Sequence, residues 1–370
     1  MKIAISGATG FVGSNLRVRL AELGHQDLVL LPHQSSASAL SQLLQGVDFV
    51  FHLAGVNRPQ DPAEFSHGNH SFTRELCAAM AAQPRRPDVL FSSSTQASTD
   101  SAYGVSKRHA EAELLQYAAD TGARTYLFRL TNVFGKWSRP NYNSAVATFC
   151  HNTARDLPIT VHDPAAPLRL IHIDDVVAEF CRLLDQPGQT GLQSSAPEYE
   201  TTVGEVAALI QSFRGSRETL MSERVGSGLT RALYATYVSF LPPEAFAYAV
   251  PRHEDPRGAF VEMLKTPDCG QFSYFTAHPG VTRGEHYHHA KTEKFLVIKG
   301  VARFGFRHIV TQEVHELIVE GGQARIVETV PGWTHNITNI GSDELVVMLW
   351  ANEVFDRQRP DTIAQNVHPS

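Results

Sequence analysis

The sequence predicts two folds on one chain, a doubly wound parallel α/β sheet followed by an all-β barrel. Apolar strand-like segments alternate with helical patterns up to about residue 180, and a glycine motif follows the first of them. After about residue 246, short β-rich segments replace the helices. At 370 residues the chain is long enough for two hydrophobic cores. We therefore expect one domain at residues 1–245 and a second at residues 246–370.

In the first domain, five short apolar segments have the length and composition of buried strands: residues 2–6, 28–31, 49–53, 89–92 and 126–130. Helical periodicity fills the intervals at residues 13–23, 65–82 and 101–120, and two more helices are expected at 203–214 and 229–240. Strands that alternate with helices form right-handed crossovers, which produce a parallel sheet covered on both faces.

In the second domain, strands separated by glycine or charged turns are expected at residues 271–276, 294–298, 301–307, 323–329 and 344–349. Many short strands without helices are typical of a β-barrel or sandwich.

The composition excludes several classes of partner. The net charge is −6 and no basic run is present, which argues against nucleic acid and against an anionic membrane surface. No apolar stretch reaches the roughly 18 residues of a membrane helix. The four cysteines are far apart and lack C-x-x-C spacing, as expected for reduced thiols. We therefore predict a cytoplasmic protein.

The glycine motif Gly7-x-x-Gly10-x-x-Gly13 also contains Thr9, Phe11 and Val12. It follows the first strand and opens a helix, which is the context that a dinucleotide-binding turn requires. Glycines allow the backbone to approach a pyrophosphate at the helix N-terminus. The alternative is a glycine-rich turn without a ligand.

Tyr103 and Lys107 are four residues apart and share one face of the expected helix. A nearby ammonium lowers the pKa of a tyrosine, which makes proton transfer feasible near neutrality. Ser94 and Thr95 follow a strand and offer hydroxyls to a substrate carbonyl. Alone, such a Tyr/Lys pair is usually a surface feature without a catalytic role. Together with the glycine motif, a catalytic role is the favoured interpretation.

These residues, together with 48–55, 129–135 and 169–176, resemble the extended short-chain dehydrogenases/reductases that act on nucleotide sugars. The resemblance covers about residues 1–245 and implies a Rossmann-type domain in which Tyr103 donates a proton. It implies that Lys107 grips the ribose and lowers the Tyr103 pKa, while Ser94 or Thr95 holds the substrate oxygen. Asn132 and Arg169 would face the sugar nucleotide, and the implied cofactor contacts beyond the glycine motif are His33, Asp48, Leu53, Ala54 and Gly55.

Two departures from this family narrow the chemistry. Gln96-Ala97 stands where the 4,6-dehydratases carry an Asp-Glu pair, so dehydration is not expected. The second strand is followed by Pro32-His33-Gln34-Ser35, with no carboxylate to hold the ribose 2′-hydroxyl of NAD. This absence favours NADP(H).

In the second domain, Gly280, His286, His288, Glu293 and Gly300 form G-x5-H-x-H-x4-E-x6-G, and His335 follows downstream. Residues two apart on a strand point to the same side, so the two histidines of the motif face together. Three imidazoles and a carboxylate suit zinc or another first-row divalent metal. The spacing resembles the two cupin motifs, although the expected P-x-G reads Val330-Pro331-Gly332.

A second interpretation needs no metal. Residues 255–262 and Arg283-Gly284-Glu285-His286 resemble the nucleotide-sugar 3,5-epimerases, which are metal-free cupins. That resemblance implies His286 as general base and Lys294 as the cation for the enolate. Arg257 and Arg283 would meet the diphosphate as bidentate donors. Zinc and Lys294 thus both remain candidates for the cation.

Over essentially the whole chain, segments 52–59, 134–137, 140–144 and 286–295 resemble bifunctional capsular-polysaccharide enzymes. The resemblance implies a zinc-bearing cupin, a homodimer, and a step towards UDP-N-acetyl-L-fucosamine. The cupin would epimerise C3 of a UDP-2-acetamido-2,6-dideoxy-4-hexulose. The first domain would reduce C4 with NADPH to the L-talose product. The alternatives are a reductase whose cupin only binds sugar or dimerises, and a cofactor-sensing regulator without turnover.

Overall fold

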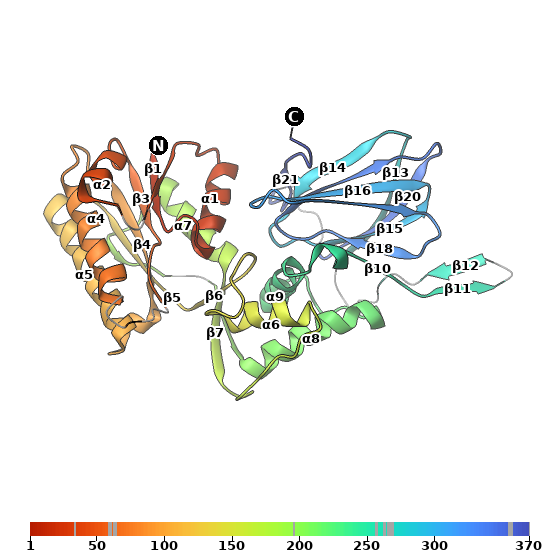
Figure 1. Ribbon diagram of the computed structural model, residues 1–370, viewed down its shortest axis with the longest axis horizontal. Helices are drawn as coiled ribbons and strands as arrows, with labels where there is room; N and C mark the ends of the chain where they lie inside the picture. The colour runs from red at the N-terminus through yellow and green to blue at the C-terminus, as the bar shows by residue number, and fades with distance from the viewer. Residues whose placement is uncertain are drawn as a thin grey trace. The chain divides into compact units, whose positions relative to one another are not determined.

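A computed structural model of the chain describes residues 1–32, 35–57, 61, 65–194, 197–255, 258–261, 264, 270–353 and 358–369 (Figure 1). The chain divides into two compact units, one of residues 1–133 and 169–200 and the other of residues 134–168 and 201–370. The helical segments within residues 134–168 and 201–245 therefore group with the barrel. The functional boundary at residue 245 stays a prediction.

The first unit is built on a parallel sheet whose strand order is β2-β1-β3-β4-β5-β8. Its strands are β1 (Ile3–Ser6), β2 (Leu28–Leu31), β3 (Phe49–His52), β4 (Asp88–Ser94), β5 (Thr125–Leu130) and β8 (Gly191–Leu192). The chain pairs β2 on one side of β1 and then β3 on the other. The strand order therefore reverses at β1, where open α/β sheets bind their ligands.

Helices cover both faces of this sheet, which confirms the doubly wound fold. One face packs against α1 (Phe11–Glu22) and α7 (Ile173–Asp185). The other packs against α2 (Ala37–Leu43), α4 (Phe72–Ala81) and α5 (Ala102–Thr121). The helix expected at residues 65–82 is divided, because a π-helical turn, Ser66–Ser71, precedes α4. Such turns are frequent at functional sites.

A small sheet of order β6-β7-β9 comprises β6 (Asn132–Phe134), β7 (Pro167–His172) and β9 (Glu198–Thr202). The helices of the second unit are α6 (Ala145–Thr153), α8 (Val203–Thr219) and α9 (Gly228–Ser239). The start of α8 is fixed by a capping box, since the Thr202 hydroxyl accepts from Glu205 N and the Glu205 carboxylate accepts from Thr202 N. Both helices expected after residue 200 are present.

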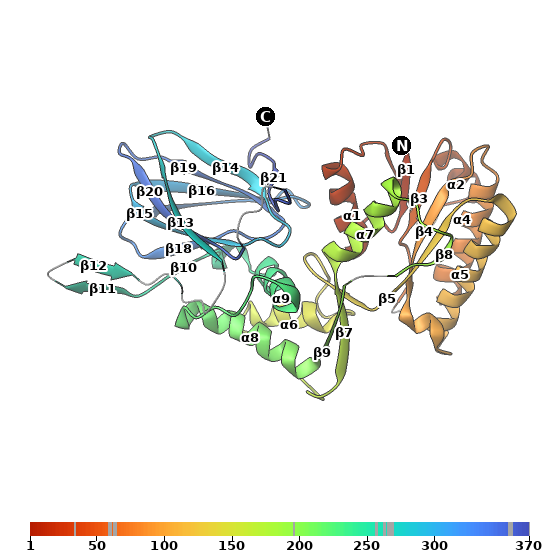
Figure 2. The same cartoon turned by 180° about the vertical axis from the view of Figure 1, so that it is seen from behind.

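The rest of the second unit is antiparallel β-structure, which confirms the all-β prediction (Figure 2). One sheet has the order β10-β18-β15-β20-β13, with β10 (Ala247–Ala249), β13 (Gln271–Ala277), β15 (Glu293–Lys299), β18 (Arg325–Glu328) and β20 (Leu345–Ala351). The other has the order β17-β16-β19-β14-β21, with β14 (Thr282–Tyr287), β16 (Val301–His308), β17 (Val314–Glu320), β19 (Trp333–Asn339) and β21 (Ile363–Ala364). A hairpin joins β11 (Arg252–Asp255) to β12 (Gly258–Val261).

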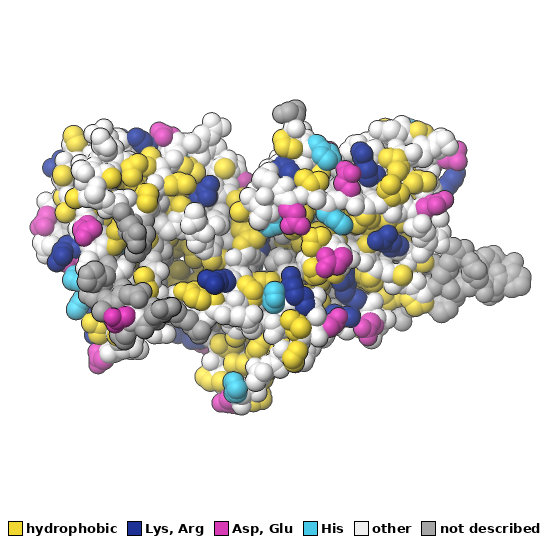
Figure 3. All heavy atoms as spheres, in the orientation of Figure 1, with side chains coloured by type: hydrophobic (Ala, Val, Ile, Leu, Met, Phe, Trp, Pro, Cys, Tyr) yellow, Lys and Arg dark blue, Asp and Glu magenta, His cyan; other side chains and the backbone are white. Residues whose placement is uncertain are grey.

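Among the described residues, no helix combines the length and hydropathy needed to cross a membrane. Figure 3 shows acidic and basic side chains interspersed over the visible face, without a large patch of one sign. The described cysteines Cys77, Cys150 and Cys181 are buried free thiols, as the spacing predicts.

A buried ionic cluster joins α8 and α9 to the barrel. The Glu328 carboxylate accepts from Arg217 Nη2 at 2.7 Å and from Tyr234 OH at 3.4 Å, and it pairs with Lys294 Nζ. Lys294 also donates to Tyr248 OH at 3.0 Å. Burial alone would raise the pKa of Glu328, but the two cations hold it below its usual range. This carboxylate is therefore the shared anion for one cation of the helices and one of the barrel.

Replacing that anion should destabilise the protein strongly. Glu328→Gln leaves two cations buried without a counter-charge, which costs about 3–5 kcal/mol in comparable buried pairs. Urea denaturation of the full chain measures the loss. The matched control is Glu316→Gln. Within the described parts of the chain, the half-exposed Glu316 pairs with the surface groups Arg303 and His368, so this variant should lose less than about 1 kcal/mol. Equal losses in both variants would refute this account of the cluster.

Candidate functional sites

The glycine turn lies at the carboxyl end of β1. Gly7 has a φ of +68°, and a Cβ there would lie 2.7 Å from Ala54 N. A Cβ on Gly13 would lie 2.2 Å from Gly7 O, so α1 packs directly on the turn. Thr9 and Gly10 are exposed, and no acidic residue occupies the first turn of α1. The positive end of the helix is therefore free to receive a phosphate.

A buried histidine, which the sequence-based prediction omits, holds the neighbouring segment. His52 Nδ1 lies 2.7 Å from Ser6 Oγ, and this oxygen accepts from Leu53 N and Ala54 N, each at 3.2 Å. On its other side, His52 Nε2 lies 2.8 Å from Thr73 Oγ1. The predicted contacts at residues 53–55 therefore lie beside the glycine turn. Their position is fixed by hydrogen bonds rather than by packing alone.

Asp48 is not brought to this site. It precedes β3 at the amino end of the parallel sheet, opposite the glycine turn, and its carboxylate accepts from Lys2 N and pairs with Arg85. The prediction of a cofactor contact was therefore wrong about the edge of the sheet. His33 lies outside the described residues.

Tyr103 and Lys107 lie on α5, whose start is capped by the Ser101 hydroxyl. Burial raises the pKa of Tyr103, and a hydrogen bond with Ser94 opposes that shift. Lys107 Nζ donates to Ser92 O at 3.0 Å, and burial lowers the pKa of Lys107 to about 8 against the attraction of Glu111. The structure thus brings Ser94 to Tyr103. Thr95 is exposed at the start of a 3-10 turn, Thr95–Ser98.

Glu111 extends this face of α5 by one further turn and was missed from the sequence. Its carboxylate accepts from Ser93 Oγ at 2.5 Å and from Arg129 at 3.0 and 2.7 Å. The spacing of Tyr103, Lys107 and Glu111 at i, i+4 and i+8 is the signal that indicates it. The bidentate pair fastens α5 to β5 and so fixes the depth at which the tyrosine sits.

The two predicted substrate residues Asn132 and Arg169 are neighbours. Asn132 Nδ2 donates to Arg169 O at 3.0 Å, and the exposed Arg169 guanidinium pairs with Glu198 at 2.5 Å. The structure therefore brings these two residues together, one at the start of β6 and the other within β7.

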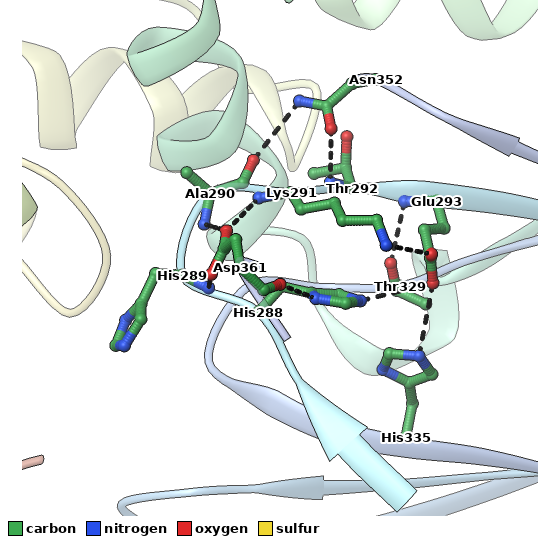
Figure 4. A network of polar contacts seen from close by, with 10 residues as sticks. All are labelled: His288, His289, Ala290, Lys291, Thr292, Glu293, Thr329, His335, Asn352 and Asp361. Atoms are coloured by element: carbon green, nitrogen blue, oxygen red, sulfur yellow. Dashed lines mark hydrogen bonds and ion pairs between the residues drawn. The ribbon is translucent and has the colours of Figure 1, made fainter. Parts of the chain in front are cut away.

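In the barrel, four predicted ligands converge. Nitrogen atoms of His286, His288 and His335 and a carboxylate oxygen of Glu293 all lie within 4.8 Å of one another. Figure 4 shows Glu293 directed towards His288 and His335, whose Nε2 atoms lie 3.3 and 3.5 Å from Oε2. Both ring nitrogens of His335 are buried, and neither makes a hydrogen bond with any residue that the structure describes. A divalent cation fits this donor set, since it would satisfy the orphaned imidazole.

Electrostatics keep these donors in the form that a metal needs. Burial and the neighbouring imidazoles of His335 and His288 lower the pKa of His286 to about 4. Burial also lowers the pKa of His335. Burial would raise the pKa of Glu293, but its interactions with His288 and His335 hold it well below its usual range. The imidazoles of His286 and His335 are therefore neutral and the Glu293 carboxylate is ionised at neutral pH, the forms that metal binding requires.

Two backbone irregularities direct the ligands. The pairing of β14 with β19 shifts between Gly284 and His286, and Glu285 has a φ of +57°. A bulge of this kind redirects the side chain that follows, here His286. Gly332 has a φ of +81°, and a Cβ there would lie 2.9 Å from the Trp137 ring, while Gly332 N donates to His288 O at 3.0 Å. The altered turn before His335 therefore requires glycine.

The remaining candidates do not join the four ligands. Lys294 follows Glu293 on β15 and so points to the opposite face, where it pairs with Glu328. This geometry does not fit the prediction that Lys294 supplies the cation for an enolate formed beside His286. Arg283 is exposed on β14 and its Nη1 donates to Thr276 O at 3.2 Å. Arg257 lies outside the described residues.

Two protein-family models match the chain, one over its N-terminal half and one over its barrel. The model described as the NAD dependent epimerase/dehydratase family matches residues 3–193, and the polysaccharide biosynthesis C-terminal domain matches residues 253–363. The chain belongs to the NAD dependent epimerase/dehydratase family. Its glycine turn and Tyr103/Lys107 pair lie inside the first match and the four barrel ligands lie inside the second.

Similar proteins extend the match over the whole chain. A UDP-2-acetamido-2,6-beta-L-arabino-hexul-4-ose reductase of Pseudomonas aeruginosa is 57% identical over 368 residues, 99% of each chain. The crystal structure of the capsular polysaccharide assembling protein CapF from Staphylococcus aureus is 38% identical with a TM-score of 0.68, covering 99% of this chain and 100% of that one. A CapF structure with the inhibitor 3-isopropenyl-tropolone is 35% identical, with a TM-score of 0.62 and the same coverage. The resemblance to fused capsular-polysaccharide enzymes is confirmed.

The four barrel ligands predict one bound divalent cation per chain. His335→Ala removes a ligand. Loss of a residue that only hydrogen-bonds a metal ligand weakens metal binding by about 10–100-fold, so this variant should weaken binding by at least that much. Metal content after dialysis, and the rise in melting temperature when metal is added, measure this. His278→Ala is the control, because His278 is an exposed histidine of the same barrel. Wild-type protein that retains no metal from a zinc-containing buffer would contradict the prediction.

Proposed function

We propose that this protein is a bifunctional nucleotide-sugar enzyme of polysaccharide synthesis. Its barrel would epimerise C3 of a UDP-2-acetamido-2,6-dideoxy-4-hexulose, and its N-terminal site would reduce the C4 ketone with NADPH to UDP-2-acetamido-2,6-dideoxy-L-talose. The observation that carries the proposal is a chain 57% identical, end to end, to a UDP-4-ketosugar reductase, which brings Ser94 to Tyr103 in its first unit and four possible metal ligands together in its barrel. Three described cysteines without disulfides suit a reducing cytoplasm.

For reduction, the chain supplies a proton and its activation. A bound nicotinamide would supply the hydride to C4, and the Tyr103 hydroxyl would donate its proton to the ketone oxygen. Ser94, which hydrogen-bonds Tyr103, would hold that oxygen in place. The Lys107 ammonium lies 5.9 Å from the Tyr103 ring and favours the phenolate that remains. Asn132 and Arg169 would contact the sugar nucleotide.

For epimerisation, the C3 proton beside the ketone is acidic, and a base removes it if a cation meets the enolate oxygen. A zinc ion held by the four ligands would supply that positive charge. Because Lys294 points away and is neutralised by Glu328, the ion is the better candidate for the cation. His286 must be neutral whether it acts as ligand or as base, and a pKa of about 4 keeps it so.

The chemistry of an inhibitor of the similar protein CapF supports a metal ion in the barrel site. CapF was solved with 3-isopropenyl-tropolone. A tropolone carries a ketone and a hydroxyl oxygen on neighbouring carbons, which together can chelate a first-row divalent cation.

A homodimer is part of this proposal. The exposed side chains of Phe272, Tyr274 and Met348, on the adjacent strands β13 and β20, offer an apolar surface to a second copy.

Two single substitutions should separate the two reactions. Tyr103→Phe removes the proton donor and should slow NADPH oxidation by about 10²–10⁴-fold, while exchange of the C3 hydrogen with solvent deuterium continues. His286→Ala should abolish that exchange. NMR of the 4-ketosugar in D₂O measures the exchange directly. Undiminished exchange in His286→Ala would favour a reductase whose cupin is only a binding or dimerisation module.

The pH profile of reduction should report Lys107. Its protonated form assists Tyr103, and its pKa is lowered to about 8 by burial, so kcat/KM for reduction should fall as pH rises through about 8. Lys107→Arg keeps its charge over this range, and its residual activity should lack that limb. A wild-type profile that stays flat well above this pH would contradict the assignment.

NADPH should bind more tightly than NADH, because no carboxylate stands in residues 32–35 after β2 to repel a 2′-phosphate. Fluorescence titration of the full chain with both reduced cofactors measures the two dissociation constants. Tighter binding of NADH would refute this part of the proposal.

A further inference from the structure

The last described segment of the chain lies along β14, the strand that carries His286. β21 pairs with β14, with Ala364 opposite His286 and Ile363 opposite Tyr287. Gln365 N donates to Glu285 O at 2.9 Å, and Val367 N donates to the Glu285 carboxylate at 2.7 Å. This segment therefore also fastens the bulge that directs His286.

Asp361 begins this segment and makes an unusually complete set of contacts. Its carboxylate accepts from three consecutive backbone N–H groups, those of His289 at 2.8 Å and of Ala290 and Lys291 at 2.7 Å each. Its backbone carbonyl accepts from His288 Nδ1 (Figure 4). Burial would raise the pKa of Asp361, but the two neighbouring imidazoles and these N–H donors lower it. An ionised carboxylate thus fills a nest of backbone amides.

The loop that Asp361 holds is the connection between two candidate ligands. Residues 289–292 join His288 to Glu293, and the far end of this loop is held by Asn352, whose Oδ1 accepts from Thr292 N at 2.9 Å. The spacing between the two ligands is therefore set by the loop and its two anchors. When His288 Nδ1 donates to the carbonyl, its Nε2 is left for Glu293 and for a metal.

We propose that Asp361 is a positioning residue for the barrel metal site. Its side chain sets the loop that places Glu293, and its main chain fixes the ring orientation and tautomer of His288. This inference rests on the metal site in the proposed function, and it gives the support of two of its ligands to a residue distant in sequence. The competing explanation is that Asp361 only staples the loop and leaves the ligand geometry unchanged.

The test uses the full chain with cobalt(II) and zinc as probes. Asp361→Asn keeps the shape of the side chain but places an amide NH₂ against at least one of the three N–H donors. We expect the dissociation constant for zinc, measured by competition with a chromophoric chelator, to rise by about 10–100-fold. The visible absorption of the cobalt(II) protein should change in intensity at saturation, because the ligand geometry changes. Asp361→Ser, which retains one acceptor oxygen, is a second variant in case the first folds poorly.

The matched control is His368→Ala, in the same segment. His368 is exposed and pairs with Glu316 on the surface, so metal affinity and spectrum should match the wild type. If the folded Asp361 variants bind zinc within about twofold of wild type with an unchanged cobalt spectrum, the positioning role is overturned while the metal site stands. If wild-type protein binds neither metal, the metal site itself is refuted, and this inference falls with it.

Discussion

Three imidazoles, those of His288 and His335 buried and that of His286 half-buried, surround one buried carboxylate, and this arrangement is the constraint on which the barrel depends. Such groups are costly to remove from water unless they find partners, and among the described residues neither ring nitrogen of His335 makes a hydrogen bond. Three local features place these groups. A bulge directs His286, and Gly332 turns the chain towards His335 with a left-handed backbone conformation. Asp361 holds the loop before Glu293. These backbone irregularities around four donors are the structural basis for proposing a bound cation there.

The N-terminal site meets a related constraint in a different way. There the buried cation is Lys107, whose ammonium is destabilised by burial and held by a carbonyl, beside the phenol that needs it. In the proposed function, both sites would place positive charge where a ketone oxygen develops negative charge. A single 4-ketosugar would then account for the pairing of the two sites, because its ketone would accept the hydride at C4 and also acidify the hydrogen at C3.

The sequence predicted the elements whose signals are periodic or glycine-based, including the strands of the parallel sheet and the His286/His288 pair. It misplaced Asp48, because a motif resemblance does not say at which edge of the sheet a residue lies. The wrong prediction for Lys294 could have been avoided, because the residue after an inward-facing Glu293 on a strand must point outward. Asp361 could not be predicted, because its partners lie far away in the sequence and are backbone groups, which leave no pattern in side-chain identity.

The central claim is that both sites act on one ketone, and isotope positions in a single product test it most directly. The wild-type protein, the UDP-4-ketosugar and unlabelled NADPH are incubated in D₂O, and the product is examined by NMR. The account predicts deuterium from solvent at C3 and protium from the cofactor at C4 of the same molecule. A reduced product that retains its original protium at C3 would contradict it.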